Sequence, residues 1–323
     1  MTVLITGGSG LIGVPLARRF AQSGEEVVIF DRVRPPQQAD DLLKGASEKI
    51  KYVVPGDVTD TLQLLEAVKK HRVDSIVHFA RVNFHMPTVE KIVIGTTTNI
   101  LELAKILGLK RVLIAGTGME FGTRLDLRPI SEDEPVNPMQ EYGIAKCAAE
   151  MIGWNYARDF GVDFVSIRLS SVYGPLERMP GFQPGSGMFR AASVAQLLRT
   201  ALDGKPFEME KGGDYPRDYT YVADAAEGAY LAATVTPLKN RLYHIGSGRS
   251  FSLRELADEI GRLVPGAKIK MGPGMLDDMP GIKTSIRGPL NIDRARNDLG
   301  FSPKYTLGQG LQEHIEWLKK HPY

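Results

Sequence analysis

The sequence predicts an α/β fold in which a doubly wound parallel sheet carries a smaller α/β lobe. Two observations predict it. Residues 1–31 read as strand, glycine-rich turn, helix and second strand, and strand and helix signals keep alternating through the first half of the chain. With 323 residues, of which 43% are hydrophobic and 24% charged, the chain has the length and composition of a globular protein with a large core.

The opening segment arranges its elements in an informative order. Residues 2–5 are apolar and partly β-branched, which predicts a strand, and the stretch TGGSGLIG follows at 6–13. Helix-forming residues then run to about Gln22, and the apolar residues 27–30 predict a second strand that ends at Asp31. This order is typical of a Rossmann-type dinucleotide-binding domain, and the alternative is an ordinary βαβ unit with a glycine turn.

Each glycine of this turn has a separate expected role. Gly7 permits a tight turn, Gly10 has no Cβ to keep a pyrophosphate away, and Gly13 lets the helix pack close to the sheet. The helix N-terminus then offers N–H groups and a positive dipole end to the phosphates. Asp31 is expected to accept hydrogen bonds from the adenosine ribose, which favours NAD over NADP, although Arg32 beside it could attract a 2′-phosphate.

Charge, hydropathy and cysteine usage exclude several classes of protein. The net charge of +2 argues against nucleic-acid or membrane partners, and no apolar run approaches the ~18 residues of a membrane span. The first strand starts at residue 2, which leaves no room for a signal peptide. Cys147 is the only cysteine and the six histidines lack metal-ligand spacing, so we expect no intrachain disulfide and no metal site. We therefore expect a cytoplasmic protein.

Further elements follow from apolar periodicity and turn residues. Strands are expected at 51–54, 75–80, 111–115, 164–169 and 243–246, the last returning to the main sheet. Helices are expected at 62–70, 89–107, 142–160, 188–202, 223–234, 253–263, 293–299 and 307–319. Residues 180–187 read as a loop that could form a substrate lid, and 271–289 as irregular. We expect a dinucleotide-binding domain of residues 1–170, with 219–247 returning to it, and a substrate-binding lobe of residues 171–218 and 248–323.

Tyr142 and Lys146 carry the clearest catalytic chemistry. At positions i and i+4 of a predicted helix, they lie on one helix face. A phenol has an unperturbed pKa of ~10, and a lysine ammonium beside it, with the positive nicotinamide ring, favours the phenolate. Tyr142 could then take the proton of a substrate hydroxyl as hydride leaves the same carbon, while Lys146 holds the nicotinamide ribose. Alone this spacing is common on surface helices, but the dinucleotide turn favours the catalytic interpretation.

Four segments of the chain together resemble one family. TGGSGLIG at 6–13, YxxxK at 142–146, RxxxxYGP at 168–175 and RDYxYV at 217–222 look like the extended short-chain dehydrogenase/reductases, also called the NAD-dependent epimerase/dehydratase family. The resemblance covers nearly the whole chain. It implies NAD as the cofactor, a nucleotide sugar as the substrate, and a homodimer packed through the helices at 89–107 and 142–160.

The resemblance also assigns site residues by position. It implies a cofactor site made by Gly7, Gly10, Leu11, Ile12, Gly13, Asp31, Arg32, Asp57, Val58, Ala80, Tyr142 and Lys146. It implies substrate contacts from Arg81, Thr117, Ser171 and Arg217, of which Arg217 would meet a phosphate. Thr117 corresponds to the family's catalytic hydroxyl, so the implied catalytic residues are Thr117, Tyr142 and Lys146. The plainer alternatives are a strand-end threonine, a turn aspartate at Asp57 and a structural Arg217–Asp218 pair.

The chain departs from the family's pattern at several site positions. Ile92 stands where relatives carry an asparagine, so a proton relay would have to use water, and Arg81 replaces a second alanine. Ser171 replaces the asparagine that commonly touches a nucleotide-linked sugar. Gly118-Met119 replaces the Asp-Glu pair of the family's dehydratases, and Glu120, one position late, is not expected to face the substrate. The missing acid argues against a dehydratase.

Together these residues predict NAD-dependent oxidoreduction at a secondary alcohol or ketone. We favour a sugar-nucleotide epimerase, because Arg217 and the RxxxxYGP frame are retained. One alternative is an NAD(P)-dependent dehydrogenase or reductase of a sugar, sugar acid or other small alcohol, which Arg81, Ile92 and Ser171 motivate. A non-catalytic dinucleotide-binding sensor ranks last, since the tyrosine and the lysine are both present.

Overall fold

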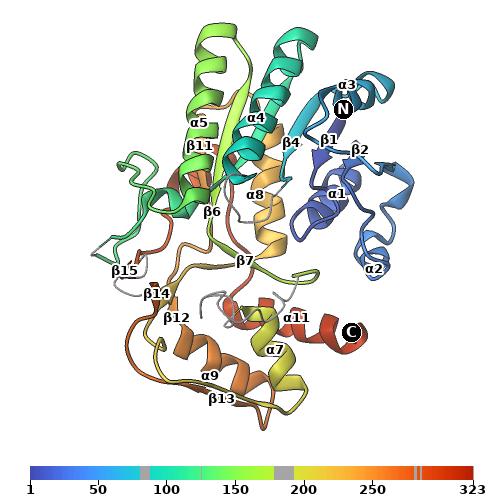
Figure 1. The fold of residues 1–323 in the computed structure, drawn as a ribbon. Coiled ribbons are helices and arrows are strands. Elements are labelled where there is room, and N and C mark those ends of the chain that lie inside the picture. The colour runs from blue at the N-terminus through green and yellow to red at the C-terminus, as the bar shows by residue number, and fades with distance from the viewer. Residues whose placement is uncertain (81–87, 125, 178–192, 280–281, 284–285, 323) are drawn as a thin grey trace.

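A computed structural model describes residues 1–80, 88–124, 126–177, 193–279, 282–283 and 286–322 (Figure 1). Seven parallel strands form its central sheet: β1 (Thr2–Thr6), β2 (Glu26–Phe30), β3 (Ile50–Val53), β4 (Ser75–His78), β5 (Arg111–Thr117), β6 (Phe164–Leu169) and β11 (Leu242–Ile245). Their order is β11-β6-β5-β4-β1-β2-β3. This sheet confirms the predicted Rossmann-type fold class, and β11 returns to pair with β6 as expected.

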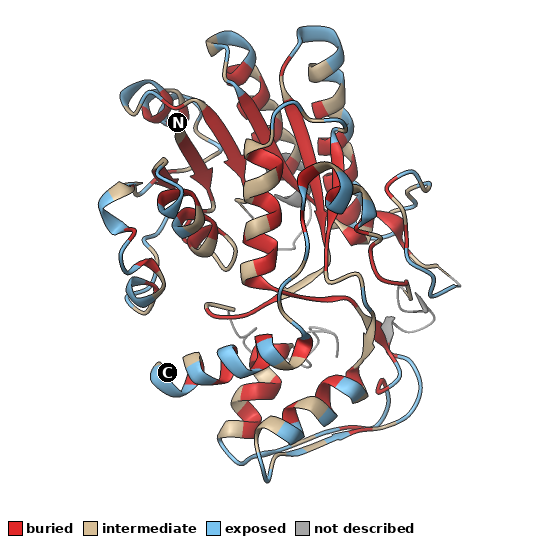
Figure 2. Ribbon diagram, turned by 180° about the vertical axis from the view of Figure 1, so that it is seen from behind, coloured by how far each residue is buried: buried red, intermediate tan, exposed pale blue. Residues whose placement is uncertain are grey.

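Helices cover both faces of the sheet (Figures 1 and 2). One face packs against α1 (Gly13–Gln22), α2 (Ala39–Leu43), α8 (Val222–Thr234) and α10 (Asp293–Leu299). The other face packs against α3 (Thr61–Lys70), α4 (Thr88–Leu107) and α5 (Glu141–Phe160). A single-turn helix, η1 (Ser47–Lys49), precedes β3. The helices bury the side that faces the sheet and expose the other, as amphipathic helices do.

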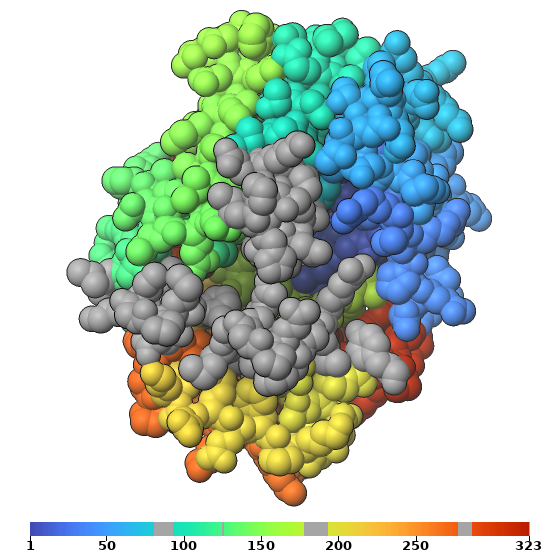
Figure 3. Space-filling view, in the orientation of Figure 1, coloured from blue at the N-terminus to red at the C-terminus, as the bar shows by residue number. Residues whose placement is uncertain are grey.

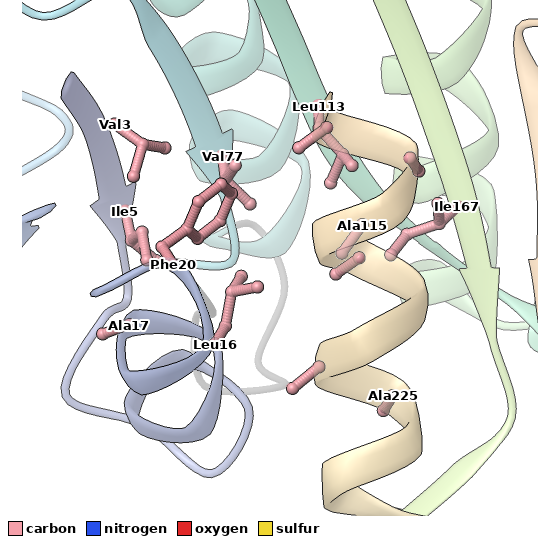
Figure 4. Packing of buried hydrophobic residues seen from close by; sticks show 14 of the residues in the cluster. Val3, Ile5, Leu16, Ala17, Phe20, Val77, Leu113, Ala115, Ile167 and Ala225 are labelled. Carbon is pink, nitrogen blue, oxygen red and sulfur yellow. The ribbon is translucent and has the colours of Figure 1, made fainter. Parts of the chain in front are cut away.

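The core beneath α1 shows how local sequence builds this arrangement. Leu16 and Phe20, one helical turn apart, are fully buried and lie against Val3 and Val77 of the sheet (Figure 4). Burial of a side chain such as Phe20 contributes roughly 2–3 kcal/mol. α8 lies beside α1, and its small residues, such as Ala225, let it pack close to the sheet.

The strand order reverses at β1, and this reversal positions the site. The chain runs outward from β1 to β2 and β3, and then places β4 on the other side of β1. In open parallel sheets, ligands bind beyond the carboxyl ends of the strands at such a reversal. The glycine-rich turn follows β1 at this point. In the space-filling view the first residues of the chain, in dark blue, reach the surface in the middle of the molecule, above the lobe (Figure 3).

A second hydrophobic cluster forms the core of the lobe. The lobe lies below the sheet in Figure 1. Its helices are α7 (Val194–Leu202), α9 (Leu253–Leu263) and α11 (Leu307–Lys320). Its strand pairs are β8 (Pro206–Met209) with β13 (Lys268–Met271), and β9 (Pro216–Arg217) with β12 (Phe251–Ser252). A further pair joins β7 (Ser171–Tyr173) to β10 (Tyr219–Tyr221).

The ends of several elements differ from expectation. β4 stops at His78, because the Ala80 N–H turns to the Thr6 hydroxyl, 3.4 Å away. The stretch 271–289 is not wholly irregular, since β14 (Asp277–Met279) and β15 (Ile282–Lys283) form an antiparallel pair. The predicted lid at 180–187 and the start of the helix expected at 188–202 lie outside the described residues.

The helix α10 lies on the sheet side of the molecule. Ile292, Ala295, Leu299 and Phe301 join the hydrophobic cluster beneath α1 and α8. We expected residues 248–323 to belong to the lobe, so this segment is an exception. The remaining domain boundaries stay a prediction.

Candidate active site

The glycine-rich turn leaves no space for side chains at three of its glycines, Gly7, Gly8 and Gly13. Gly7 has a φ of +70°, and a Cβ on it would lie 2.6 Å from the backbone nitrogen of Ala80. A Cβ on Gly13 would lie 2.4 Å from the carbonyl oxygen of Gly7. The turn, the end of β4 and the start of α1 are therefore in direct backbone contact. The N-cap residue of α1, Ile12, has an apolar side chain and makes no side-chain cap hydrogen bond. Val14 donates its N–H to the Gly10 carbonyl (3.2 Å), and Pro15 has no N–H, so Gly13 is the residue of the first turn whose N–H can face a phosphate.

Asp31 is tied to this turn from the end of β2. Its Oδ2 accepts a hydrogen bond from the Ser9 N–H (3.1 Å), and its Oδ1 accepts one from the Val33 N–H (3.4 Å). The Ser9 hydroxyl in turn donates to the Val33 carbonyl (2.7 Å). A carboxylate thus stands beside the glycine turn, and the neighbouring Arg32 is exposed.

Asp57 and Val58 lie in the loop after β3. Asp57 Oδ1 accepts hydrogen bonds from the N–H and the hydroxyl of Thr59, at 2.9 and 2.8 Å, and these bonds lower the pKa of the Asp57 carboxyl. These contacts are those of a turn aspartate. A contact with the adenine stays a prediction.

Thr117 ends β5 and caps the short helix η2 (Gly118–Phe121). Its Oγ1 accepts a hydrogen bond from the Met119 N–H (3.3 Å), and its own N–H donates to Glu120 Oε1 (2.9 Å). This reciprocal capping box holds the threonine in one orientation at the carboxyl edge of the sheet. Since Oγ1 acts as an acceptor here, the hydroxyl hydrogen can be donated to a ligand.

Tyr142 and Lys146 lie on the first two turns of α5, next to this loop. Lys146 Nζ is 5.7 Å from the centroid of the Tyr142 ring, and Lys146 is only 5% exposed. Between them, Gly143 makes the close approach possible, because a Cβ there would lie 2.9 Å from the carbonyl oxygen of Met119. The structure therefore brings the start of α5 against η2, and with it Tyr142 to the neighbourhood of Thr117.

A buried histidine lies behind Lys146. His78 Nδ1 is 2.7 Å from Thr6 Oγ1, and its Nε2 is 3.2 Å from Thr96 Oγ1. Burial first, and then the charge of Lys146, lower the pKa of His78 to about 3. The ring is therefore neutral at physiological pH. His78 is thus a core residue that links β1, β4 and α4.

The residues expected on the substrate side lie where the sheet meets the lobe. Ser171, in β7, donates its N–H to the carbonyl of Asp218 (3.0 Å). Arg217, in β9, lies with its guanidinium carbon 5.5 Å from the Tyr215 ring centroid. The Asp218 carboxylate accepts hydrogen bonds from the N–H and hydroxyl of Ser247 (2.9 and 2.6 Å) and from the Leu290 N–H (3.2 Å). Asp218 is thus a structural residue.

Arg287 is a candidate site residue that the sequence reading missed. A Cβ on Gly118 would lie 3.6 Å from Arg287 Nε, so a guanidinium from the C-terminal part of the chain lies beside the Thr117 loop. A bridge between Ile130 and Leu290 holds the two segments together. No local pattern could reveal a contact between residues so far apart in sequence. Arg81 and the side chain of Ile92 lie outside the described residues.

The sequence model of one family matches most of the chain. This family, described as the NAD dependent epimerase/dehydratase family, matches residues 3–246. The chain belongs to this family. The resemblance drawn from the sequence is therefore confirmed, and as an NAD-dependent epimerase/dehydratase family member the protein is an enzyme with NAD as its cofactor.

Relatives of several activities resemble this family member to a similar degree. The UDP-glucose 4-epimerase of Halalkalibacterium halodurans is 27% identical, and the alignment covers 100% of this chain and 97% of the relative. The UDP-glucuronic acid decarboxylase 6 of Arabidopsis thaliana is 29% identical, with 96% and 87% covered. The dTDP-glucose 4,6-dehydratase of Bacillus anthracis str. Ames, solved in complex with NAD, superposes with a TM-score of 0.84 at 22% identity, with 100% and 97% covered. Similarity alone does not separate these reactions.

Among the described residues, no group of three or more His, Cys, Asp or Glu side chains could hold a metal ion. No helix in the described segments is long and apolar enough to cross a membrane.

Proposed function

We propose that the protein is a sugar-nucleotide epimerase, which oxidises a secondary alcohol of the sugar and reduces the resulting ketone from the other face. The observation that carries this proposal is the meeting of Tyr142 and Lys146 with the Thr117 loop, through the close contact at Gly143. The resemblance to a UDP-glucose 4-epimerase over the whole chain supports the same reaction.

The glycine turn and its neighbours fit the cofactor. Backbone N–H groups of the glycine turn and of Gly13 at the start of α1 would bind the pyrophosphate, and the Asp31 carboxylate would accept hydrogen bonds from the adenosine ribose. Leu11, Ile12 and Ala80 would line the same crevice, and Lys146 would hold the nicotinamide ribose. Bound NAD would supply a hydride acceptor for the oxidation and a hydride donor for the return.

Protein side chains would accept and return the proton of the substrate hydroxyl. Tyr142 would take the proton of the substrate hydroxyl and give it back after the hydride returns. The Lys146 ammonium, 5.7 Å from the ring centroid, would stabilise the negative charge on the Tyr142 oxygen. The Thr117 hydroxyl would donate a hydrogen bond to the reacting oxygen. Because His78 is neutral, it adds no competing positive charge behind Lys146.

The substrate side would be anchored through its diphosphate. The Arg217 guanidinium, at the junction of sheet and lobe, has the fork geometry that suits phosphate oxygens. Holding the diphosphate while the sugar turns is what an epimerase needs, since hydride must return to the opposite face. Ser171 and Arg81 would contact the sugar.

The protein purified without added cofactor tests this proposal. An epimerase should retain NAD(H) through purification, because the cofactor ends each cycle as it began. It should interconvert UDP-glucose and its 4-epimer, or another pair from a panel of sugar nucleotides, with no net rise in nicotinamide absorbance. Arg217→Ala should raise the KM for those substrates by more than tenfold, because the variant leaves a desolvated phosphate unpaired.

Other outcomes would establish the alternatives. Steady NADH formation with a simple sugar or sugar acid, unchanged in Arg217→Ala, would establish a dehydrogenase. Loss of water from a sugar nucleotide would establish a dehydratase. Binding of NAD(H) with no turnover across both panels would establish a non-catalytic sensor.

We further propose a homodimer packed through α4 and α5. Ile144 and Met151, two turns apart on α5, are 51% and 48% exposed, and Ile106 on α4 is 69% exposed. Exposed apolar side chains on these two neighbouring helices favour a protein interface. Light scattering of the wild type and of Met151→Glu tests this: a dimer that becomes a monomer supports the interface. A wild type that is already monomeric would contradict it.

A further inference from the structure

Glu120 lies directly behind the Thr117 loop and is completely buried. Its Oε1 accepts the Thr117 N–H (2.9 Å), and its Oε2 accepts Arg168 Nε–H (2.9 Å). Arg168 also donates through Nη2 to Glu150 Oε2 (2.6 Å), and the Ser166 hydroxyl donates to Glu150 Oε1 (2.6 Å). A chain of hydrogen bonds thus runs from the backbone of Thr117 through Glu120 and Arg168 to Glu150.

The cluster is tightly enclosed. A Cβ on Gly116 would lie 3.0 Å from Glu120 Oε1 and 3.1 Å from Glu150 Oε1. The two carboxyls therefore pack directly against the backbone of Gly116. Arg168, Glu120 and Glu150 are each 2% exposed or less. Two carboxyls share a single guanidinium here, in surroundings where an uncompensated charge is strongly unfavourable. The pair is therefore most stable when it holds one proton.

We propose that Glu120 is a positioning residue for Thr117, and that the proton it shares with Glu150 must be present for the Thr117 loop to hold its catalytic orientation. With the proton, Glu120, Glu150 and Arg168 sum to zero charge. When the proton leaves for solvent at alkaline pH, the buried cluster carries a net negative charge and the two carboxylates repel each other across the guanidinium. The catalytic half of this inference rests on the proposed function.

The groups packed around Glu120 support the shared proton. Burial, and then the charge of Glu150, raise the pKa of Glu120 to about 8, against the opposing effect of Arg168. From α5, the pKa of the Cys147 thiol is raised by burial and by the two carboxyls, so the thiol is neutral. From β11, His244 is neutral as well, with a pKa lowered to about 3 by burial and by Arg168. The charge balance of the cluster therefore depends on Glu120 and Glu150.

The NMR signal of the Thr117 amide can report this loss of the proton without an activity measurement. With threonine labelled in nitrogen-15, the amide signal of Thr117 in the NAD-bound protein should shift as pH passes through about 8. In Glu120→Gln, which keeps an acceptor for the Thr117 N–H but cannot lose a proton, the signal should stay in place. An unchanging wild-type signal, or the same titration in Glu120→Gln, would overturn the inference.

The catalytic consequence is measured with UDP-glucose as the probe. The wild-type kcat should fall as pH rises through about 8, and Glu120→Gln should retain kcat within about tenfold while losing that alkaline fall. Glu120→Leu, which leaves the Thr117 N–H and Arg168 Nε unpaired, should lower kcat by ten- to hundredfold with an unchanged NAD dissociation constant. Glu66→Gln, at an exposed position on α3, is the matched control and should behave as the wild type.

The outcomes separate this inference from the proposed function. If kcat falls at alkaline pH to the same extent in the wild type and in Glu120→Gln, another group causes the fall. That result would overturn the proposed link between Glu120 and catalysis. If the wild type turns over no sugar nucleotide, the proposed function fails, and the Thr117 amide titration alone decides whether Glu120 controls the loop. Circular dichroism of Glu120→Leu distinguishes a misplaced loop from an unfolded protein.

Discussion

At the scale of single residues, charged side chains lie beside the groups that are proposed to exchange protons. Lys146 is buried and lies over the Tyr142 ring, while the neutral His78 fills the space behind it. The exposed Arg32 and the tethered Asp31 stand at the other end of the expected cofactor site. Substitutions at these residues should therefore affect cofactor binding and turnover to different extents.

Tyr142→Phe should reduce turnover by ~10²–10⁴-fold, because the lost hydroxyl is the proposed proton carrier. NAD affinity should stay nearly intact, since the ring and Lys146 remain. Stopped-flow rates and a fluorescence titration with NADH measure the two quantities. Turnover close to that of the wild type would remove Tyr142 from the mechanism.

Asp31 should make the protein prefer NAD over NADP, because its carboxylate repels a 2′-phosphate. Dissociation constants of both cofactors check this by calorimetry. Asp31→Ala should narrow the difference and Arg32→Ala should widen it. Equal or tighter binding of NADP by the wild type would contradict the assignment.

The Glu120 carboxyl should also leave a signature in stability. Its pKa rises from 4.5 in the unfolded chain to about 8 in the folded protein, so between these values the unfolded state has lost a proton that the folded state keeps. The free energy of unfolding should therefore fall as pH rises from about 4.5 to 8, and level off above that. Urea denaturation at several pH values measures it, and a fall of equal size in Glu120→Gln would exclude Glu120 as its source.

At the scale of elements, close backbone contacts align the site. α5 meets η2 at Gly143, and α1 meets the turn after β1 at Gly13. At both places a backbone atom, which cannot rotate away, occupies the position of the missing side chain. The close approach at each glycine therefore fixes the position of Tyr142 on α5 and of the N-terminus of α1.

Gly143→Ala tests this alignment. Its Cβ would lie 2.9 Å from the Met119 carbonyl oxygen, so α5 or η2 must shift, and turnover should fall by about ten- to hundredfold. Gly261→Ala on α9 is the control, because no atom lies within 4 Å of the added Cβ. That variant should keep full activity and gain about 0.5–1 kcal/mol of stability. Unimpaired turnover in Gly143→Ala would mean that the contact does not align the site.

At the scale of the whole molecule, Asp218 joins the sheet to the lobe. Its carboxylate binds the loop after β11 through Ser247 and the C-terminal segment through Leu290, and it follows Arg217 in the chain. The same short segment thus carries a structural carboxylate and the residue proposed to hold the substrate diphosphate. Substitution of Asp218 should therefore affect stability, and substitution of Arg217 should affect substrate binding.

Asp218→Ala should lower the free energy of unfolding by roughly 2–4 kcal/mol, because it leaves buried N–H groups without acceptors. Arg217→Ala should change stability by less than about 1 kcal/mol and act on substrate binding. Urea denaturation of both variants measures the difference. Equal destabilisation by the two would favour the structural Arg217–Asp218 pair over a phosphate site.

The sequence by itself determined the features that depend on local patterns. Apolar runs and turn residues located the strands of the main sheet, since strands that helices cover on both faces have continuous apolar sequences. The glycine turn with Asp31 and the Tyr142–Lys146 spacing were likewise readable, because each lies within one βαβ unit or one helix. The family and its cofactor followed from these motifs.

Only the tertiary structure decided which distant residues meet. Sequence does not reveal that His78 lies between Thr6 and Thr96, or that Arg287 reaches Gly118. The sequence reading placed Glu120 away from the substrate but could not find its partner, because Arg168 comes from another strand. Such contacts arise from the packing of elements far apart in the chain, and no local pattern records them.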